Sequence, residues 1–277
     1  MSLKKNNLST TILPTIQKII NRGVFYTAKI EFYKIIFDEK YKNSIMREYL
    51  IRMINYISIN TNISQAKFII KILDSKTKSY AQLKQDIFVL TMLNNKFNGY
   101  FIEVGAGDGI NFSNTYLLEK EFDWNGILIE PNRTFYKACL ISRKCKVHNK
   151  LLLNSENNKL KFYEKSIGEF SHSEGFGNES ASEVESIYEV ETIKFEEIFG
   201  VISKIPEIDF LSIDTEGSES EILQSIDFNK YKPKVICIEH NFNKKNRVFF
   251  TKYLADKGYE LIYPGISRWD SWFVIKP

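Results

Sequence analysis

Short apolar runs bounded by turn residues alternate with helix-like stretches from residue 99 to the end of the 277-residue chain. Six runs have the composition of buried strands: YFIEV, GILIE, IDFLSID, KVICIE, YELIYP and SWFVIK. Strands that alternate with helices form a parallel, doubly wound α/β sheet. Only the short stretch GISRWD separates the last two runs. They should therefore form an antiparallel hairpin that closes the sheet.

Helical patterns precede the first strand. The stretch SYAQLKQDIFVLTMLNNK has apolar residues at helical spacing, and Ser79 is its expected cap. Residues 1–78 contain another such pattern, YKNSIMREYLIRMINYI, and are predicted to be an N-terminal helical extension to a main domain of residues 79–277. The extension would either cover part of the main domain, which we favour, or dock on a partner or on a second copy in a homo-oligomer.

The segment from Lys165 to Glu191 has the composition of a long loop. It is dense in Ser, Gly and Glu, and we expect little regular structure there. A lid over a binding site and a disordered insertion are both compatible with this composition.

Composition and charge exclude several classes of protein. An apolar fraction of 43% is enough for a globular core. The net charge of +4 comes from lysines interspersed with acids, which gives no support to nucleic-acid binding. The three cysteines lack a CxxC spacing, and polar residues interrupt the apolar ones near the amino terminus. We therefore expect a cytoplasmic protein without a signal peptide or transmembrane segment.

The first strand runs into a glycine turn. Glu103 is followed by Gly105, Gly107 and Gly109, and a helix comes next. Glycines allow positive φ and the close approach of a ligand, and a helix start offers free N–H groups. The turn lies at the carboxyl end of a strand, where open α/β sheets bind ligands. The dinucleotide pattern GxGxxG does not fit, because Ile110 stands at its third glycine.

Two acids flank the turn and indicate the ligand. Glu103 suits a ligand with a cationic amino-acid part. Glu130 closes the second strand, where a carboxylate can accept both hydroxyls of a ribose, although alone it could equally be a solvated acid. Together they predict a nucleoside with a cationic, zwitterionic tail, namely S-adenosylmethionine. The residues expected to bind it are Glu103, Gly105, Ala106, Gly107, Asp108, Asn114, Glu130, Pro131, Asn149 and Asp214.

Several segments resemble the FkbM-type S-adenosylmethionine-dependent methyltransferases. They are FIEVGAGDGINFSNTYLLE, GILIEPN, DFLSIDTEGSESEIL and VICIEHNF, with SYAQLKQD upstream. The resemblance implies the class I, Rossmann-like fold, a seven-stranded sheet that ends in an antiparallel hairpin. It also implies O-methylation, mostly of sugars or polyketide-type products. We expect an O-methyltransferase for a sugar hydroxyl, on a nucleotide-activated sugar or a surface-glycan (capsule or lipopolysaccharide) building block.

Two other functions stay open. A methyltransferase for a lipid-linked or amine acceptor would differ only in its pocket. A catalytically silent nucleotide-binding module would keep the fold, but the intact acids and glycines count against it.

Polar residues after two later strands are candidates for catalysis. Asp214 would cap its turn, bind the methionine end of the donor, orient the acceptor or ligate a metal, and Ser218 would cap the next helix. Glu239 and His240 follow the next strand. His240 is either a general base, since an unperturbed histidine has a pKa of about 6.5, or a hydrogen-bonding loop residue. Asp214, Glu239 and His240 could together hold a divalent metal, a hypothesis that we rank below the metal-free one.

Three further places contain candidate residues. His148, with Asn149, would lie near the adenine, and His172 would close over the acceptor. Tyr80, Gln85 and Asp86 would line the donor side, although packing and solvation would explain them equally well.

Overall fold

The computed structural model describes residues 68, 71, 78–154, 158–177, 182–201, 205–264 and 267–276. The chain divides into two compact units, Met1–Ser75 and Lys76–Pro277. The elements named below belong to the second unit. The helical pattern expected at residues 41–57 lies outside the described residues.

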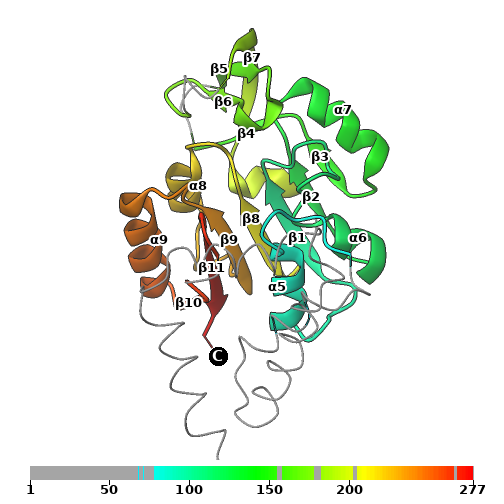
Figure 1. Ribbon diagram of the computed structural model, residues 1–277, viewed down its shortest axis with the longest axis vertical. Coiled ribbons are helices and arrows are strands. Elements are labelled where there is room, and N and C mark those ends of the chain that lie inside the picture. The colour runs from blue at the N-terminus through cyan, green and yellow to red at the C-terminus, as the bar shows by residue number, and fades with distance from the viewer. Residues whose placement is uncertain are drawn as a thin grey trace, which may run out of the picture. The chain divides into compact units, whose positions relative to one another are not determined.

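A seven-stranded sheet forms the centre of this unit (Figure 1). Its strand order is β10-β11-β9-β8-β1-β2-β3. The strands are β1 Tyr100–Val104, β2 Asn125–Ile129, β3 Lys146–His148, β8 Phe210–Ile213, β9 Val235–Glu239, β10 Tyr259–Ile262 and β11 Asp270–Ile275. Strands β3, β2, β1, β8 and β9 pair in parallel, and β11 is antiparallel to both β9 and β10. The predicted parallel sheet with a terminal antiparallel pair is confirmed.

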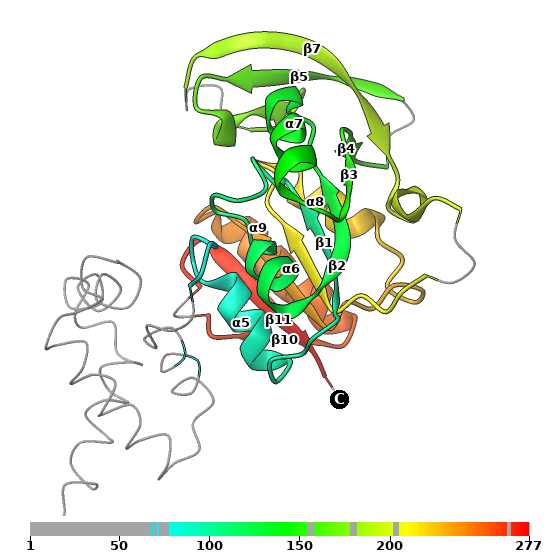
Figure 2. The ribbon, with the colours of Figure 1, turned by 90° about the vertical axis from the view of Figure 1, so that its right-hand side faces the viewer.

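Helices cover both faces of the central sheet. Helices α5 (Gln85–Met92), α6 (Tyr116–Phe122) and α7 (Arg133–Ser142) lie on one face, and α8 (Glu219–Ser225) and α9 (Lys244–Asp256) lie on the other (Figure 2). Strands covered on both faces become continuous apolar runs, which is why β1 and β8 are buried almost throughout. None of the described helices is both long and apolar enough to cross a bilayer.

A second, smaller sheet is built from the chain between β3 and β8. It has the order β4-β7-β5-β6 and lies beyond the carboxyl ends of the central strands (Figure 1). Its strands are β4 Leu151–Leu152, β5 Lys159–Lys165, β6 His172–Ser173 and β7 Val184–Ile193, with the short 3-10 helices η2 Gly168–Phe170 and η3 Phe195–Phe199.

The expectation of little regular structure between Lys165 and Glu191 is therefore wrong. Solvent exposure alternates along part of strand β7, where Glu189 is exposed between the less exposed Tyr188 and Val190. An alternating strand of this kind has one covered and one solvated face. Several of the glutamates that indicated a loop lie on the solvated face of β7.

The expected cap of the first helix is also wrong. Helix α5 begins only at Gln85, after Lys84 in a left-handed conformation with φ 66°. The hydroxyl of Ser79 instead donates to Asp86 Oδ1 at 2.7 Å, and the backbone N–H of Tyr80 donates to Asp86 Oδ2 at 2.9 Å. Asp86 thus organises the turn before α5.

Candidate active site

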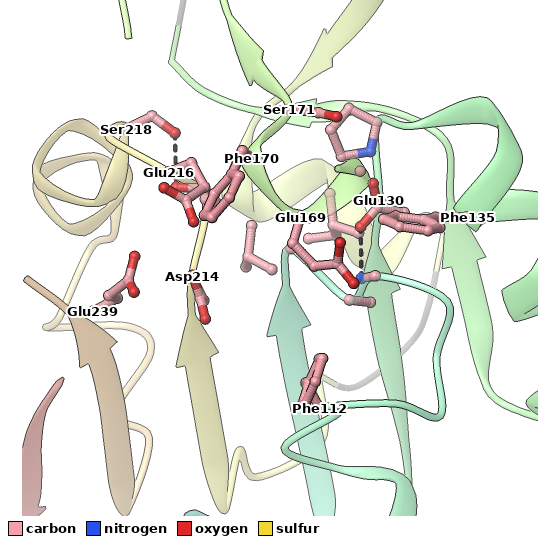
Figure 3. A pocket seen from close by; sticks show the side chains of 18 of the residues that line it. Phe112, Glu130, Phe135, Glu169, Phe170, Ser171, Asp214, Glu216, Ser218 and Glu239 are labelled. Carbon is pink, nitrogen blue, oxygen red and sulfur yellow. Dashed lines mark hydrogen bonds between the residues drawn. The ribbon is translucent and has the colours of Figure 1, made fainter. Parts of the chain in front are cut away.

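A cavity of about 530 Å³ lies at the carboxyl ends of the central strands (Figure 3). The turn after β1 lines one side, residues that follow β2, β8 and β9 line the walls, and residues 167–171 of the small sheet form a roof. Its volume is within the range of about 300–1,000 Å³ that is typical of small-molecule sites. The position is the one where open α/β sheets bind ligands.

The glycine turn meets two different requirements. A methyl group on Gly105, whose φ is 80°, would lie 1.6 Å from the carbonyl oxygen of Asp214. Gly105 is therefore required by packing. At Gly107, with φ 56°, no atom lies within 4 Å of the position a Cβ would take. Because Gly107 lines the cavity, its missing side chain lets a ligand approach the main chain.

Glu130 faces this turn. Its Oε2 accepts the backbone N–H of Gly107 at 2.8 Å, and its Oε1 accepts the backbone N–H of Asn132 at 2.8 Å. Burial raises the pKa of Glu130 to about 8. Each carboxylate oxygen has two lone pairs, so the same oxygens can also accept the hydroxyls of a ribose.

Most of the predicted donor ligands meet at the cavity. They are Gly105, Ala106, Gly107, Asp108, Glu130, Pro131 and Asp214. Two other predicted donor ligands, Asn114 and Asn149, do not line the cavity and form hydrogen bonds within the protein. The amide of Asn114 donates to Ser212 Oγ at 2.8 Å. The amide of Asn149 donates to the carbonyl oxygens of Glu130 at 2.9 Å and Pro131 at 3.0 Å.

Glu103 is buried behind the glycine turn and is not among the residues that line the cavity. Its carboxylate accepts the backbone N–H of Asn114 at 2.6 Å and the hydroxyls of Ser113 and Thr115, and the Arg143 guanidinium lies 3.7 Å away. These contacts fix the start of α6. A direct contact between Glu103 and the donor stays a prediction.

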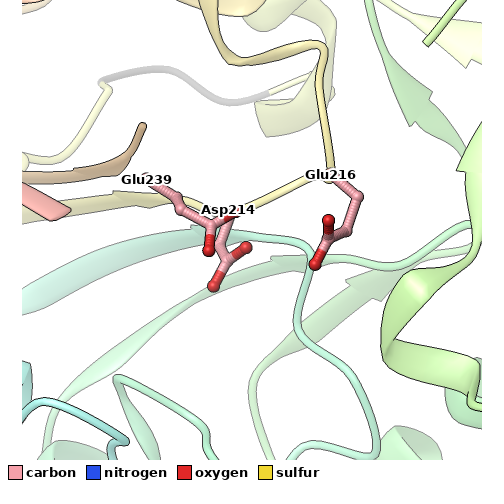
Figure 4. A group of neighbouring side chains, drawn as sticks. All are labelled: Asp214, Glu216 and Glu239. Carbon is pink, nitrogen blue, oxygen red and sulfur yellow. The ribbon is translucent and has the colours of Figure 1, made fainter. Parts of the chain in front are cut away.

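Three carboxyl groups gather on the opposite wall. Asp214 follows β8, Glu216 lies two residues further on, and Glu239 ends β9 (Figure 4). One oxygen from each lies within 4.8 Å of the others. Burial, followed by the charges of neighbouring acids, raises the pKa of Asp214 and of Glu239. Burial and Glu219 raise the pKa of Glu216 to about 7. These three residues are called the carboxyl cluster below, and within it Glu216 can bind and release a proton near neutral pH.

The turn after β8 presents Glu216 to the cavity. Glu219 Oε1 accepts the backbone N–H groups of Thr215 at 2.9 Å and Gly217 at 3.0 Å, and Glu216 has φ 55°. Ser218 occupies the position before α8 as expected, but its hydroxyl donates to Thr215 at 2.8 Å and caps no backbone group. Glu219 therefore stabilises the turn before α8, and the helix cap predicted for Ser218 is not formed.

The predicted histidines do not line the cavity. His240 is only 3% exposed, and burial and Arg247 lower its pKa. His148 is hydrogen-bonded through Nε2 to the carbonyl oxygen of Ile198, and His172 is buried and hydrogen-bonded to the carbonyl oxygen of Ser173. In the acidic group, Glu216 takes the place expected for His240. The catalytic role of His240 stays a prediction that this placement does not favour.

Residues 79–86, which lead into helix α5, contribute to the cavity a different residue from those expected. Gln85 donates to Asp270 Oδ2 at 2.7 Å and Asp86 holds the turn before α5, while Gln82 lines the cavity. Other lining residues that were not predicted include Phe112, Phe135, Leu151, Leu152, Phe162, Glu169, Phe170, Phe242 and Trp269. Glu216 could have been found, because it lies on the turn already assigned to the strand end.

The cavity is strongly acidic. Its described ionisable lining residues are Asp108, Glu130, Lys150, Glu169, Asp214, Glu216 and Glu239. Lys150 is the sole cation in this group and pairs with Glu191 at 2.9 Å. Clustered charge of one sign attracts ligands of the opposite sign. Because a bound cation also stabilises the ionised form of a buried carboxyl group, the cavity favours a cationic ligand over a phosphate.

The strand order, the reversed β11, the glycine turn and the acid after β2 together define a class I, Rossmann-like methyltransferase. Residues 103–261 match the model of the methyltransferase FkbM domain. The match spans more than half of the chain, and the chain belongs to the FkbM methyltransferase family. Membership implies S-adenosylmethionine as the methyl donor.

Solved structures are similar at low sequence identity. An FkbM methyltransferase from Methylobacillus flagellatus KT is 14% identical with a TM-score of 0.43, and the match covers 83% of this chain and 59% of that one. A precorrin-6y C5,15-methyltransferase from Geobacter metallireducens GS-15 is 13% identical with a TM-score of 0.37, covering 68% and 79%. No curated protein matches the chain significantly.

Proposed function

We propose that the protein transfers the methyl group of S-adenosylmethionine to a hydroxyl of a sugar, carried by a nucleotide-activated sugar or a surface-glycan building block. The observation that carries the proposal is the acidic cavity in which the glycine turn and Glu130 face the carboxyl cluster. The turn and Glu130 suit the donor, and the carboxyl cluster suits a hydroxyl acceptor.

The donor is a cationic nucleoside, with a sulfonium and an ammonium group. The acids of the cavity favour these charges. Glu130 can accept the ribose hydroxyls, and the open space at Gly107 admits the ligand to the main chain. The apolar side chains of Phe135, Leu151 and Phe162 in the same cavity suit an adenine ring.

The carboxyl cluster suits the acceptor step. In the reaction the acceptor oxygen attacks the methyl carbon, the sulfur–carbon bond breaks, and the sulfonium becomes a neutral thioether. The hydroxyl proton must leave, and a carboxylate of the cluster can take it. Glu216 suits this role, because its pKa of about 7 leaves much of it deprotonated near neutral pH.

Aromatic residues support a sugar as the acceptor. Phe112, Phe242 and Trp269 line the cavity that contains the carboxyl cluster. Flat rings pack against the C–H face of a pyranose, and carboxylates accept hydrogen bonds from its hydroxyls. The acids would also attract an amine, so an acceptor screen has to include amino compounds.

The carboxyl cluster also fits a hard divalent cation. Such ions prefer carboxylate oxygens, and three of these lie within 4.8 Å of one another. A bound cation would lower the pKa of an acceptor hydroxyl. Activity that survives EDTA treatment would exclude an essential metal.

The test is a screen of nucleotide sugars, free sugars and amines with S-adenosylmethionine, read by mass for one added methyl group. Glu216→Gln should reduce turnover by about 10² and weaken donor binding much less, because the other acids of the cavity remain. Glu221→Gln is the matched control, because Glu221 is exposed on α8 and does not line the cavity. Full turnover in Glu216→Gln would remove its role as base, and absence of donor binding would overturn the proposed function.

A further inference from the structure

Four cations lie close in sequence to two aromatic residues that line the acidic cavity. They are Lys244, Lys245 and Arg247 at the start of α9 and Arg268 in the loop before β11. These four residues, with the aromatic Phe242 and Trp269, are called the basic rim. Phe242 and Trp269 line the cavity, and their ring centres are 5.9 Å apart.

Direct contacts hold the two segments of the basic rim together. The guanidinium of Arg268 lies 4.5 Å from the centre of the Trp269 ring. Arg247 donates to the carbonyl oxygen of Pro264 at 3.0 Å. The backbone N–H of Asn241 donates to the carbonyl oxygen of Trp269 at 3.0 Å. The cations therefore come from two chain segments that meet where Phe242 and Trp269 line the cavity.

Helix stability does not explain the two lysines of the basic rim. The first turn of α9 has no acidic residue and begins with Lys244 and Lys245, although the positive end of the helix dipole disfavours cations there. Both lysines are exposed, and no described carboxylate forms an ion pair with either. Phe242 and Arg268 also adopt positive φ, 57° and 51°, and unfavourable backbone conformations of this kind concentrate at functional sites.

The charges divide the acceptor side into two zones. Inside the cavity, the carboxyl cluster can form hydrogen bonds with hydroxyls and provides no cation for a phosphate. At the basic rim, cations and aromatic rings suit an anionic group attached to the acceptor. An activated sugar has this polarity, with hydroxyls on the sugar and a diphosphate at the anomeric end.

We propose that the basic rim binds the diphosphate through which the acceptor sugar is activated. The inference rests on the proposed function and adds the place where the activating group is held. The diphosphate of a nucleotide sugar and that of a lipid-linked sugar share this chemistry.

The test compares two charge-reversal variants of the full chain, each loaded with S-adenosylhomocysteine. Lys244→Glu/Lys245→Glu changes the basic rim, and Lys252→Glu/Lys257→Glu makes the same change in charge at exposed positions further along α9 and at its end. Calorimetry with inorganic pyrophosphate, uridine diphosphate and farnesyl diphosphate measures anion binding. Prior titration with S-adenosylhomocysteine verifies folding and the donor site independently.

We expect pyrophosphate to bind the unchanged protein and the control, and to bind the rim variant about tenfold or more weakly. Tighter binding of uridine diphosphate than of pyrophosphate would identify a nucleotide sugar, and tighter binding of farnesyl diphosphate a lipid-linked one. Equal affinity in the rim variant and the control, or no pyrophosphate binding at all, would overturn the proposal. If the rim binds diphosphate but no sugar in the screen is methylated, the proposed acceptor fails and the anion site stands.

Discussion

At the scale of single residues, two glycines of the turn after β1 have different roles. Gly105 is held against the Asp214 carbonyl, whereas Gly107 leaves open space in the cavity. A sequence pattern treats the two glycines alike. The structure assigns one to packing and the other to ligand access, and only the second can be altered without a steric clash inside the protein.

We expect Gly107→Ala to weaken S-adenosylmethionine binding about tenfold or more, because the new methyl group would occupy space that the ligand needs. Gly258→Ala is the control, since Gly258 also has positive φ, 89°, and open space but does not line the cavity. Both variants should lose about 1 kcal/mol or more of stability from backbone strain. Calorimetry and urea unfolding measure the two effects. Equal donor affinity in both variants would contradict this role for Gly107.

Glu130 should make stability depend on pH. Its pKa is raised to about 8 in the folded protein, so between the unfolded value of about 4.3 and 8 the folded state holds a proton that the unfolded state has lost. The stability contributed by this proton is complete below pH 4 and is lost as the pH rises through 8. Glu130→Gln cannot titrate. Urea unfolding from pH 5 to 8 measures the free energy of unfolding of both proteins. Relative to the wild type, the free energy of unfolding of the variant should rise by up to about 1.4 kcal/mol per pH unit. Parallel curves for the two proteins would show that Glu130 is not buried as described.

Residues at the end of a parallel strand or directly after it were predictable, because strand ends meet at one edge of the sheet. Gly105, Glu130, Asp214 and Glu239 follow from this rule and line the cavity. His240 follows from the same rule but does not reach it. Which way a residue near a strand end points depends on the turn that follows, and this turn is fixed by contacts distant in sequence.

At the scale of elements, the roof of the cavity depends on the small sheet. The segment after β6 packs on the turn after β8, since a methyl group on Gly217 would lie 2.7 Å from the backbone nitrogen of Gly177. On the other side, Arg133 at the start of α7 lies 4.0 Å from the ring centre of Tyr188 on β7. The small sheet is therefore held on both sides of the cavity that it covers.

We expect Gly217→Ala to displace the roof and to weaken donor binding severalfold, because the backbone of Gly177 cannot move aside as a flexible side chain could. Gly175→Ala is the matched control, with positive φ of 87° and no atom within 4 Å of the new methyl group. Calorimetry with S-adenosylmethionine compares the two variants. If both bind equally well, the contact of the roof with the turn does not support the donor site.

The central sheet was predictable and the small sheet was not, for one physical reason. Strands β1, β2, β8 and β9 are covered on both faces and leave a continuous apolar signal. The long strand β7 has one solvated face, and its glutamates have the composition of a loop. The roof residues Glu169 and Phe170 were missed together with the sheet that carries them.

At the scale of the whole molecule, the residues that line the cavity fall between Gln82 and Trp269, within the unit Lys76–Pro277. The matched family region, residues 103–261, also lies inside this unit. The unit contains a seven-stranded sheet with helices on both faces, an arrangement that forms a hydrophobic core of its own. The separation of an N-terminal extension from a main domain, predicted at residues 78 and 79, can therefore be tested by truncation.

We expect a chain of residues 76–277 to fold and to bind S-adenosylmethionine within about threefold of the full chain, because no described lining residue is removed. Calorimetry measures donor affinity, and the cooperativity of urea unfolding reports whether the core is complete. The same truncated chain carrying Gly107→Ala is the control for specific binding. Cooperative unfolding with lost donor affinity would show that residues 1–75 contribute to the donor site. Loss of cooperative unfolding would instead show that they complete the core, and either result would contradict a self-sufficient methyltransferase domain.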